Sequence, residues 1–415
     1  MEPGADLIIW DARLIDGRGG PPADHAVVRV RDGRIEAIEE VAGRDVPPGA
    51  VDIAGRALLP GLIDAHTHVI SDTERSPGFG PAPALHGEEP RPEGLRWFVL
   101  AKAARAFLAA GITTLRDVGS PDDEAITLRE AIRHGLVEGP RILSCGRIVS
   151  ATSPGERIFG TMYEEADGPW EMRRAVRRQL KRGADYIKVM ATGARSVERE
   201  DPEPAQMTPG ELGAAVDEAH RLGVRVAAHA EGLEGVRLAI EAGVDTIEHG
   251  LSLHRSPKLL DRMADQGIVL VPTLSTFDDL ADRFATEFAP SLVAQARRQG
   301  AEARLTLLAA RAAGVVLAMG YDSGPPGANV GELVRMVEAG LTAGEAIAAA
   351  TSGSARALGL TDRGTIEPGR AADLLVVDGD PLADPAVLAD QARIRLVAAD
   401  GVPVAGTSWA GASAR

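Results

Sequence analysis

The middle of the chain alternates short apolar runs with longer segments that are apolar on one side only. The short runs, rich in Val, Ile, Leu and Ala, predict buried strands, and the longer segments have the 3.6-residue period of amphipathic helices. The predicted strands lie within residues 58–69, 113–117, 141–145, 186–190, 225–229, 246–249, 268–272 and 315–319. The clearest predicted helices cover residues 95–110, 169–182, 208–222, 233–242 and 290–313. Repeated units of strand and helix predict an α/β fold with a (β/α)₈ barrel of parallel strands.

A doubly wound open sheet is the alternative arrangement for strands and helices in this order. That fold binds phosphates at a glycine-rich turn after its first strand, and no such turn follows the first predicted strand here. A glycine precedes several of the strands, as expected where a helix ends before the next strand begins. We therefore favour the closed barrel.

Both ends of the chain have a different pattern, in which apolar and polar residues alternate. Short strands are predicted at residues 7–10, 26–30, 34–38, 373–377 and 394–398. Asp32 and Gly33 stand between two of these strands and predict a tight hairpin. Pairing strands from the two ends is the simplest way to satisfy their edges. We therefore predict a discontinuous β-sandwich domain from residues 1–57 and 364–415, around a barrel of residues 58–363.

Composition and charge narrow the class of protein. The chain has 415 residues, 45% of them hydrophobic, which suits a globular protein with a large core. The net charge is −15 and no apolar run approaches the ~20 residues of a membrane-spanning helix, so we expect neither nucleic-acid nor membrane partners. Cys145 is the single cysteine and the acidic start does not resemble a signal peptide, so we expect a cytoplasmic protein.

The candidate chemistry begins at the end of the first predicted strand, where one residue separates His66 from His68. Side chains alternate faces along a strand, so both imidazoles point the same way and can reach one metal ion. Two half-buried histidines in a sheet are the alternative, because a metal site needs more than two ligands. Further ligand-type residues stand near the carboxyl ends of later strands: Lys188, His229, His249 and Asp322. Active sites of (β/α)₈ barrels lie at that end, so we expect all six side chains to converge.

Lys188 and Asp322 each admit two interpretations. A buried lysine loses its proton readily, and the neutral amine can add carbon dioxide to form a carbamate that bridges two metal ions. A structural lysine paired with a carboxylate at the barrel rim is the alternative. Asp322 can bind a metal ion, accept a proton from metal-bound water, or do both. It can also cap a helix at the sequence Asp-Ser-Gly, and this role can coexist with the others.

Together these motifs resemble those of the amidohydrolase superfamily of metal-dependent hydrolases. The matching stretches are residues 59–68 (LPGLIDAHTH), 187–190 (IKVM), 228–232 (AHAEG), 247–250 (IEHG) and Asp322. Residues 364–374 (GTIEPGRAADL) resemble the segment that leads into the terminal β-sandwich of that family. The chain looks most like the branch that contains imidazolonepropionase-related proteins and Xaa-Pro or Xaa-Arg dipeptidases.

The resemblance implies two divalent metal ions, with zinc as the expected metal, and hydrolysis of an amide bond. His66 and His68 then bind one ion, and the histidines of the fifth and sixth strands bind the other. A carboxylated Lys188 bridges the two ions, and Asp322 binds metal and transfers the proton. The resemblance also implies a homo-oligomer.

The chain departs from the dipeptidase pattern at two positions. The loop of residues 150–157, after the third strand, lacks the histidine that polarises the substrate carbonyl in that branch. Glu231 replaces a tyrosine or histidine two residues after the fifth-strand ligand; it is a candidate for binding a cationic substrate, with a rim salt bridge as the alternative. Arg157 and Arg195, in loops at the same end, are candidates for holding a substrate carboxylate, although most loop arginines are only solvated.

We therefore predict a binuclear metal-dependent amidohydrolase that cleaves a C–N bond by attack of metal-bound hydroxide. Its expected substrate is a small molecule such as an N-acyl amino acid or a dipeptide. Opening of a cyclic amide such as an imidazolone or hydantoin, or hydrolysis of a lactone or phosphoester, is the alternative within the enzyme class. A pseudoenzyme that keeps the barrel as a scaffold would lack ligands, yet all six positions are filled.

Overall fold

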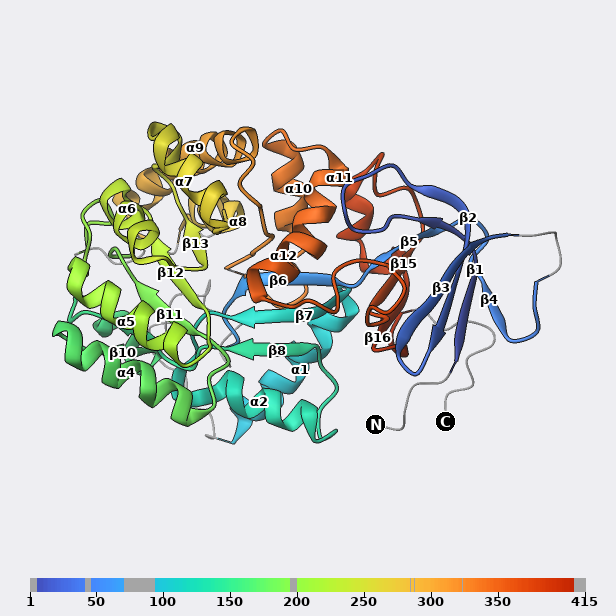
Figure 1. The fold of residues 1–415 in the computed structure, drawn as a ribbon, viewed down its shortest axis with the longest axis horizontal. Helices are drawn as coiled ribbons and strands as arrows, with labels where there is room; N and C mark the ends of the chain where they lie inside the picture. Colours follow the sequence, from blue (N-terminus) through green and yellow to red (C-terminus); the bar gives the residue numbers. More distant parts are fainter. Residues whose placement is uncertain are drawn as a thin grey trace.

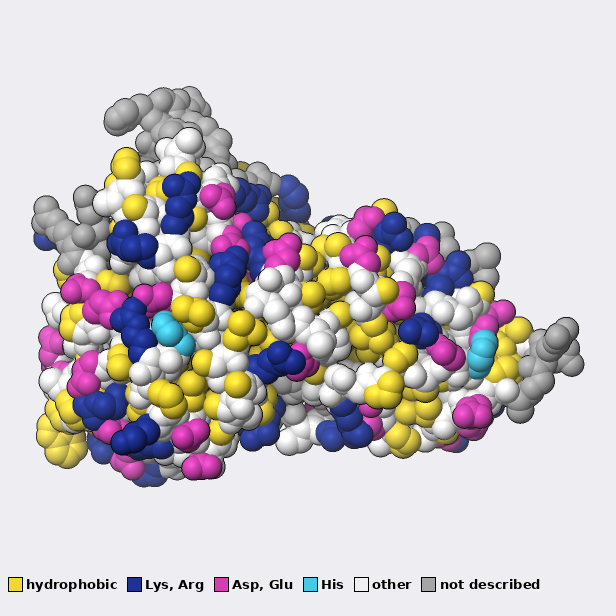
Figure 2. Space-filling model, turned by 90° about the horizontal axis from the view of Figure 1, so that it is seen from above, with side chains coloured by type: hydrophobic (Ala, Val, Ile, Leu, Met, Phe, Trp, Pro, Cys, Tyr) yellow, Lys and Arg dark blue, Asp and Glu magenta, His cyan; other side chains and the backbone are white. Residues whose placement is uncertain are grey.

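The computed structural model describes residues 6–41, 46–70, 94–194, 200–283, 285–286, 288–322 and 324–406. A largely antiparallel sheet lies at one end of the molecule, and parallel strands with helices around them fill the other end (Figure 1). On the face seen in Figure 2, basic and acidic side chains are interspersed, without a block of one sign. The predicted mixed α/β fold with parallel sheets is confirmed.

The sheet at one end is built from both ends of the sequence. Its eight strands lie in the order β17-β16-β15-β5-β1-β2-β3, with β4 paired to β1. They are β1 (Leu7–Leu14), β2 (Ala23–Arg31), β3 (Arg34–Glu40), β4 (Ala50–Asp52), β5 (Ala57–Pro60), β15 (Leu374–Val377), β16 (Ile394–Ala399) and β17 (Val402–Ala405). β15 runs antiparallel to β5, with Leu375 opposite Leu59, and so joins the two ends of the chain. Asp32 and Gly33, both at positive φ, form the predicted hairpin between β2 and β3.

The parallel strands form two sheets. One has three strands in the order β6-β7-β8, and the other has six in the order β10-β9-β11-β12-β13-β14. They are β6 (Leu62–Thr67), β7 (Ile112–Asp117), β8 (Arg141–Ser144), β9 (Ile148–Ser150), β10 (Tyr163–Glu165), β11 (Ile187–Met190), β12 (Val226–Ala230), β13 (Thr246–His249) and β14 (Val269–Val271). Every residue of β11 and β12 is buried, which explains why these strands are continuous apolar runs in the sequence.

Helices surround the parallel strands (Figure 1). The longer ones are α1 (Leu95–Ala109), α2 (Glu124–Arg133), α4 (Gly168–Arg182), α5 (Pro209–Arg221), α6 (Leu233–Ala242), α7 (Pro257–Gln266), α9 (Pro290–Ala312) and α10 (Gly331–Glu338). The Thr208 side chain caps α5 and accepts a hydrogen bond from the Glu211 N–H, while Gly183 and Gly243 end α4 and α6 in the left-handed conformation. These local signals explain why the five predicted helices agree with the observed ones to within one residue at each end.

The eighth predicted strand does not form a regular strand. Within residues 315–319 only Leu317 makes a bridge, to Leu270. The Met319 N–H instead donates to the carbonyl oxygen of Ala349 at 3.0 Å. The π-helical turn Ala349–Gly353 packs so closely here that a Cβ on Gly353 would lie 2.1 Å from the Leu317 carbonyl oxygen. The helical turn therefore takes a hydrogen bond that a strand ladder would use.

Strands β9 and β10 have no counterpart in the predicted pattern, because three residues are too few for a periodic signal. β9 pairs with β11 through Val149 opposite Val189, and β10 adds to the outer edge of β9. β8 approaches the six-stranded sheet through the hydrogen bond from Asp185 N–H to the Ser144 carbonyl, at 2.8 Å. The two short strands thus widen the sheet beside β11, and β9 ends at Ser150, the first residue of the predicted loop.

One cluster of buried apolar side chains connects the terminal sheet with the parallel strands. It runs from Leu59 and Leu375 of the terminal sheet through Leu62 of β6 to Phe107 of α1 and Leu333 of α10. This shared core joins the terminal sheet to the amino end of β6 and to the helices around the parallel strands. Among the described residues, no helix combines the length and the apolar character needed to cross a membrane.

Candidate metal centre

The carboxyl ends of the parallel strands surround a small cavity that opens to solvent. All six predicted ligands line it: His66, His68, Lys188, His229, His249 and Asp322. The other described lining residues are Ile148, Phe159, Tyr163, Met190 and Ala194. Residues more than 250 positions apart in the sequence therefore meet in one cavity.

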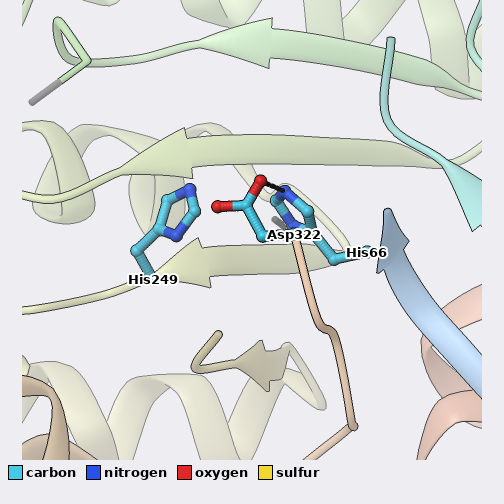
Figure 3. Close-up of side chains that lie close together, drawn as sticks. All are labelled: His66, His249 and Asp322. Atoms are coloured by element: carbon cyan, nitrogen blue, oxygen red, sulfur yellow. Dashed lines mark ion pairs between the residues drawn. The ribbon is translucent and has the colours of Figure 1, made fainter. Parts of the chain in front are cut away.

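The imidazole rings pack edge to face around this cavity. The ring centroids of His66 and His249 are 5.1 Å apart, and those of His229 and His249 are 4.6 Å apart. The rings of His66 and His68 are 6.0 Å apart. Figure 3 shows the Asp322 carboxylate between the rings of His249 and His66, with the ion pair to His66 marked. Rings at these distances can contribute ligand atoms to the same metal centre.

Three of the histidines have their Nδ1 atoms bound by groups outside the cavity. The partners are Glu248 Oε2 for His66 (2.6 Å), the Gly119 carbonyl oxygen for His68 (2.7 Å) and Thr273 Oγ1 for His249 (2.7 Å). A carboxylate or carbonyl oxygen only accepts, so Nδ1 of His66 and of His68 carries the proton. The lone pair is then on Nε2, which faces the cavity and can bind a metal ion.

His229 is turned the other way. Its Nε2 lies 3.1 Å from the carbonyl oxygen of Gly193 and 3.5 Å from Oε1 of Glu231. Nδ1 is therefore the nitrogen that can serve as a ligand. The Gln299 side-chain amide donates to the other carboxylate oxygen of Glu231 at 3.1 Å, so Glu231 is held behind His229.

Asp322 follows the irregular eighth segment with φ of 65°, and its N–H donates to the His66 carbonyl oxygen at 2.7 Å. Its Oδ1 lies 3.3 Å from His66 Nε2 and 3.4 Å from His68 Nε2. Burial opposes ionisation, but the imidazoles, His66 foremost, hold the pKa of the Asp322 carboxyl well below its usual range. The helix-cap interpretation is wrong, because the next described helix, α10, begins only at Gly331.

Lys188 is the second residue of β11 and is 2% exposed. Burial lowers the pKa of its amine, and the nearby Arg116 guanidinium lowers it further, while Glu248 and Asp322 oppose this. The side chain therefore lies inside the cavity and not at an exposed rim. A buried amine with a lowered pKa is the chemical state that reacts with carbon dioxide.

The three predicted substrate-binding residues are placed differently. Glu231 is 1% exposed, so the alternative of a rim carboxylate is wrong; it lies behind His229 and is not part of the cavity lining. Arg157 is exposed on the short helix α3 (Glu156–Phe159) and does not line the cavity either. Arg195 lies outside the described residues.

A buried charged pair behind His66 was not anticipated. Glu248, fully buried, accepts from Arg116 Nη2 at 2.7 Å, and Arg116 also donates to the Ala65 carbonyl at 2.6 Å and to Thr246 Oγ1 at 3.1 Å. Burial opposes the charge on Glu248, but Arg116 and His66 hold the pKa of this carboxyl well below its usual range. An arginine and a glutamate inside apolar strands were the available signal, because buried charges require partners.

Among the residues that the structure describes, two groups of side chains have ligand atoms close enough to hold a metal ion. Ligand atoms of His66, His249 and Asp322 lie within 4.8 Å of one another, and so do those of His229, Glu231 and His249. Imidazole and carboxylate donors of this kind suit zinc and related divalent ions. The donor set and the orientation of its rings therefore fit a metal centre.

The chain is similar to known proteins over most of its length. Residues 57–404 match the family model described as Amidohydrolase family. The chain is 32% identical over 413 residues to an ochratoxinase of Aspergillus niger, covering 91% of this chain and 82% of that protein. It is 26% identical over 355 residues to an imidazolonepropionase of Paracoccus denitrificans, covering 79% and 80%. A crystal structure of a Xaa-Pro dipeptidase with bound methionine in the active site superposes with a TM-score of 0.85 at 29% identity, covering 97% of this chain and 100% of that one.

Proposed function

Because this chain belongs to the amidohydrolase family and is a hydrolase of carbon–nitrogen bonds, we propose that it is a binuclear metal-dependent enzyme for small amides. The expected substrates are N-acyl amino acids or dipeptides. The single observation that carries this proposal is the convergence of six ligand-type side chains on one cavity.

We assign the ligands as the motifs suggest. His66 and His68 bind one ion, His229 and His249 bind the other, and a carboxylated Lys188 bridges them. The Nδ1 partners of His66 and His68 support this assignment, because they direct Nε2 of each ring toward the metal. Zinc is the expected metal for such donors.

Two divalent ions, when bound, supply positive charge that polarises the amide carbonyl and lowers the pKa of water. Asp322 then acts as the proton carrier. It accepts the proton of the attacking water as the water oxygen bonds to the carbonyl carbon, and it delivers that proton to the nitrogen as the C–N bond breaks.

We also propose that the two parallel sheets form one closed (β/α)₈ barrel of residues 58–363. The hydrogen bond from Ala65 N–H to the Met319 carbonyl, at 2.8 Å, and the bridge of Leu270 to Leu317 support closure, because they link β6 and β14 through the eighth segment. A β-sandwich domain of residues 1–57 and 364–415 completes the proposed organisation.

Opening of a cyclic amide is the second candidate. The absence of a histidine from residues 150–157 and the similarity to an imidazolonepropionase favour it. Both reactions break a C–N bond at a carbonyl and need the same metal ligands. They differ in the shape of the substrate.

A substrate screen separates the two candidates. Zinc-reconstituted protein is incubated with a library of dipeptides and N-acyl amino acids, and free amine is measured, alongside imidazolones and hydantoins assayed by ring opening. Amine release establishes the linear reaction, and turnover confined to the cyclic compounds establishes the second candidate. No turnover of either set by zinc-loaded protein would refute both.

One substitution and one change in the reconstitution conditions test the assigned roles. Asp322→Asn should abolish turnover with the fold retained, and full activity in that variant would overturn the proton-carrier assignment. Leaving bicarbonate out during zinc reconstitution should lower activity if Lys188 is carboxylated. Activity independent of bicarbonate would count against the carbamate.

We further propose a cytoplasmic homo-oligomer that acts on small molecules. The single cysteine supports a reducing compartment, and the net charge of −15 disfavours nucleic acid as a partner. Light scattering of the purified protein would determine the number of subunits.

A further inference from the structure

Tyr163 is the one polar side chain in the described cavity lining that is not a predicted metal ligand. It is the first residue of β10, opposite Ile148 of β9, and is 5% exposed. Its ring stacks on that of Phe159, with centroids 4.9 Å apart and planes 22° apart. Packing therefore holds the ring in the cavity wall.

The Tyr163 hydroxyl makes no hydrogen bond with the residues that the structure describes. The other two of the three tyrosines do: Tyr186 donates to the Asp117 carbonyl at 2.7 Å, and Tyr321 donates to Asp279 Oδ2 at 3.1 Å. Tyrosine hydroxyls usually find a partner, and at the wall of the cavity that holds the metal-ligand residues a bound substrate can supply one.

The backbone around Tyr163 is well supported by hydrogen bonds. Glu200 accepts from the N–H groups of Gly155 (2.8 Å) and Ala194 (2.7 Å), and Glu165 accepts from the Ser153 N–H (3.0 Å). The loop that leads to Phe159 is thus tied to the chain after β11. Burial, together with Glu200 and Glu165, raises the pKa of Tyr163, so its hydroxyl keeps the proton that a donor needs.

We propose that the Tyr163 hydroxyl donates a hydrogen bond to the carbonyl oxygen of the scissile amide. The inference rests on the proposed function and deepens it. The carbonyl oxygen gains negative charge as water adds, so a fixed donor stabilises the transition state more than the bound substrate. Tyr163 would then polarise the substrate carbonyl, which is the role of the histidine that residues 150–157 lack.

The test is Tyr163→Phe in the full-length, zinc-reconstituted protein, because this change removes the hydroxyl and keeps the stacked ring. We expect kcat on the best amide substrate to fall by roughly 10²–10³-fold, the effect of losing one oxyanion donor, with little change in KM. Zinc content should be unchanged. The thermal midpoint should stay close to that of the wild type, because the described residues make no hydrogen bond to the hydroxyl that would be lost.

Tyr186→Phe is the matched control, because it removes a hydroxyl that is bonded to the Asp117 carbonyl. Its thermal midpoint should fall, unlike that of Tyr163→Phe. A kcat for Tyr163→Phe within twofold of the wild type, or a change in KM alone, would overturn the proposal.

A binding measurement separates failure of this inference from failure of the proposed function. A phosphonate analogue of an N-acyl amino acid presents tetrahedral anionic oxygens, and calorimetry gives its affinity without turnover. The wild type should bind it at least about tenfold more tightly than Tyr163→Phe, by loss of one charge-assisted hydrogen bond. Equal affinities would refute the role of Tyr163 even if no substrate is hydrolysed, whereas an inactive wild type with unequal affinities would refute only the proposed function.

Discussion

Replacing Arg116 alone should destabilise the protein more than replacing Arg116 and Glu248 together. Arg116 is 3% exposed and its guanidinium donates to three oxygens, one of them on the fully buried Glu248. Glu248 in turn accepts from His66 Nδ1 at 2.6 Å. Arg116→Met therefore leaves a buried carboxylate without its cation, whereas Arg116→Met with Glu248→Met removes both charges.

The magnitude follows from the burial of the pair. Removing one partner of a buried ion pair costs about 3–5 kcal/mol, whereas replacing both partners by apolar side chains of similar volume is often neutral. Arg116 also loses its bonds to Ala65 and Thr246 in either variant, and each such bond is worth about 1 kcal/mol. We expect the free energy of unfolding to fall by about 5–7 kcal/mol in Arg116→Met and by about 2 kcal/mol in the double variant.

The double variant should keep most of its stability but lose zinc affinity. It lacks the acceptor of His66 Nδ1, and loss of such a partner typically weakens metal binding about 10–100-fold. Urea unfolding of the metal-free proteins measures stability, and competition with a chromophoric chelator measures zinc affinity. Arg237→Met is the control, because its pair with Glu234 is 39% and 53% exposed and should contribute under about 1 kcal/mol. Equal loss of stability in the single and double variants, or wild-type zinc affinity in the double variant, would refute the reasoning.

Three further predictions concern other buried groups. Gly320→Ala should lower both the unfolding midpoint and the zinc affinity, because its Cβ would lie 2.6 Å from that of His66; an unchanged midpoint in thermal unfolding would contradict this. Burial raises the pKa of Glu332 from 4.5 to about 7, so the neutral carboxyl stabilises the fold below about pH 4.5 and this contribution is lost as pH rises through 7. Relative to Glu332→Gln, the wild type should lose up to about 3 kcal/mol of unfolding free energy between pH 4.5 and 8 in urea titrations, and a difference independent of pH would sink the assignment. Cys145 is fully buried and burial raises the pKa of its thiol, so a thiol-specific disulfide reagent should label it only upon unfolding; fast labelling of native protein would show otherwise.

The helices were predictable because their signals are local. The apolar period, the Thr208 cap and the glycines after the last turn all lie within the helix or next to it. The irregularity of the eighth segment was not predictable. The run from Val315 to Met319 looks like a strand, but the Met319 N–H donates to Ala349, in a helical turn that lies far along the chain. A pattern read along the chain cannot report such a competitor.

The sequence by itself determined the chemical inventory of the candidate site: two histidines one residue apart, a lysine within an apolar strand, and histidines or an aspartate at the ends of later strands. Strand periodicity also determined that these groups would share one end of the parallel strands. Only the tertiary structure decided which nitrogen of His66 faces the cavity, since the partner of its Nδ1, Glu248, comes from another strand. It likewise decided that Glu231 lies behind His229 and that Tyr163 enters the cavity wall. Periodicity places a side chain on a face of its own strand, but the partner of a buried polar group is supplied by whichever strand or loop packs beside it.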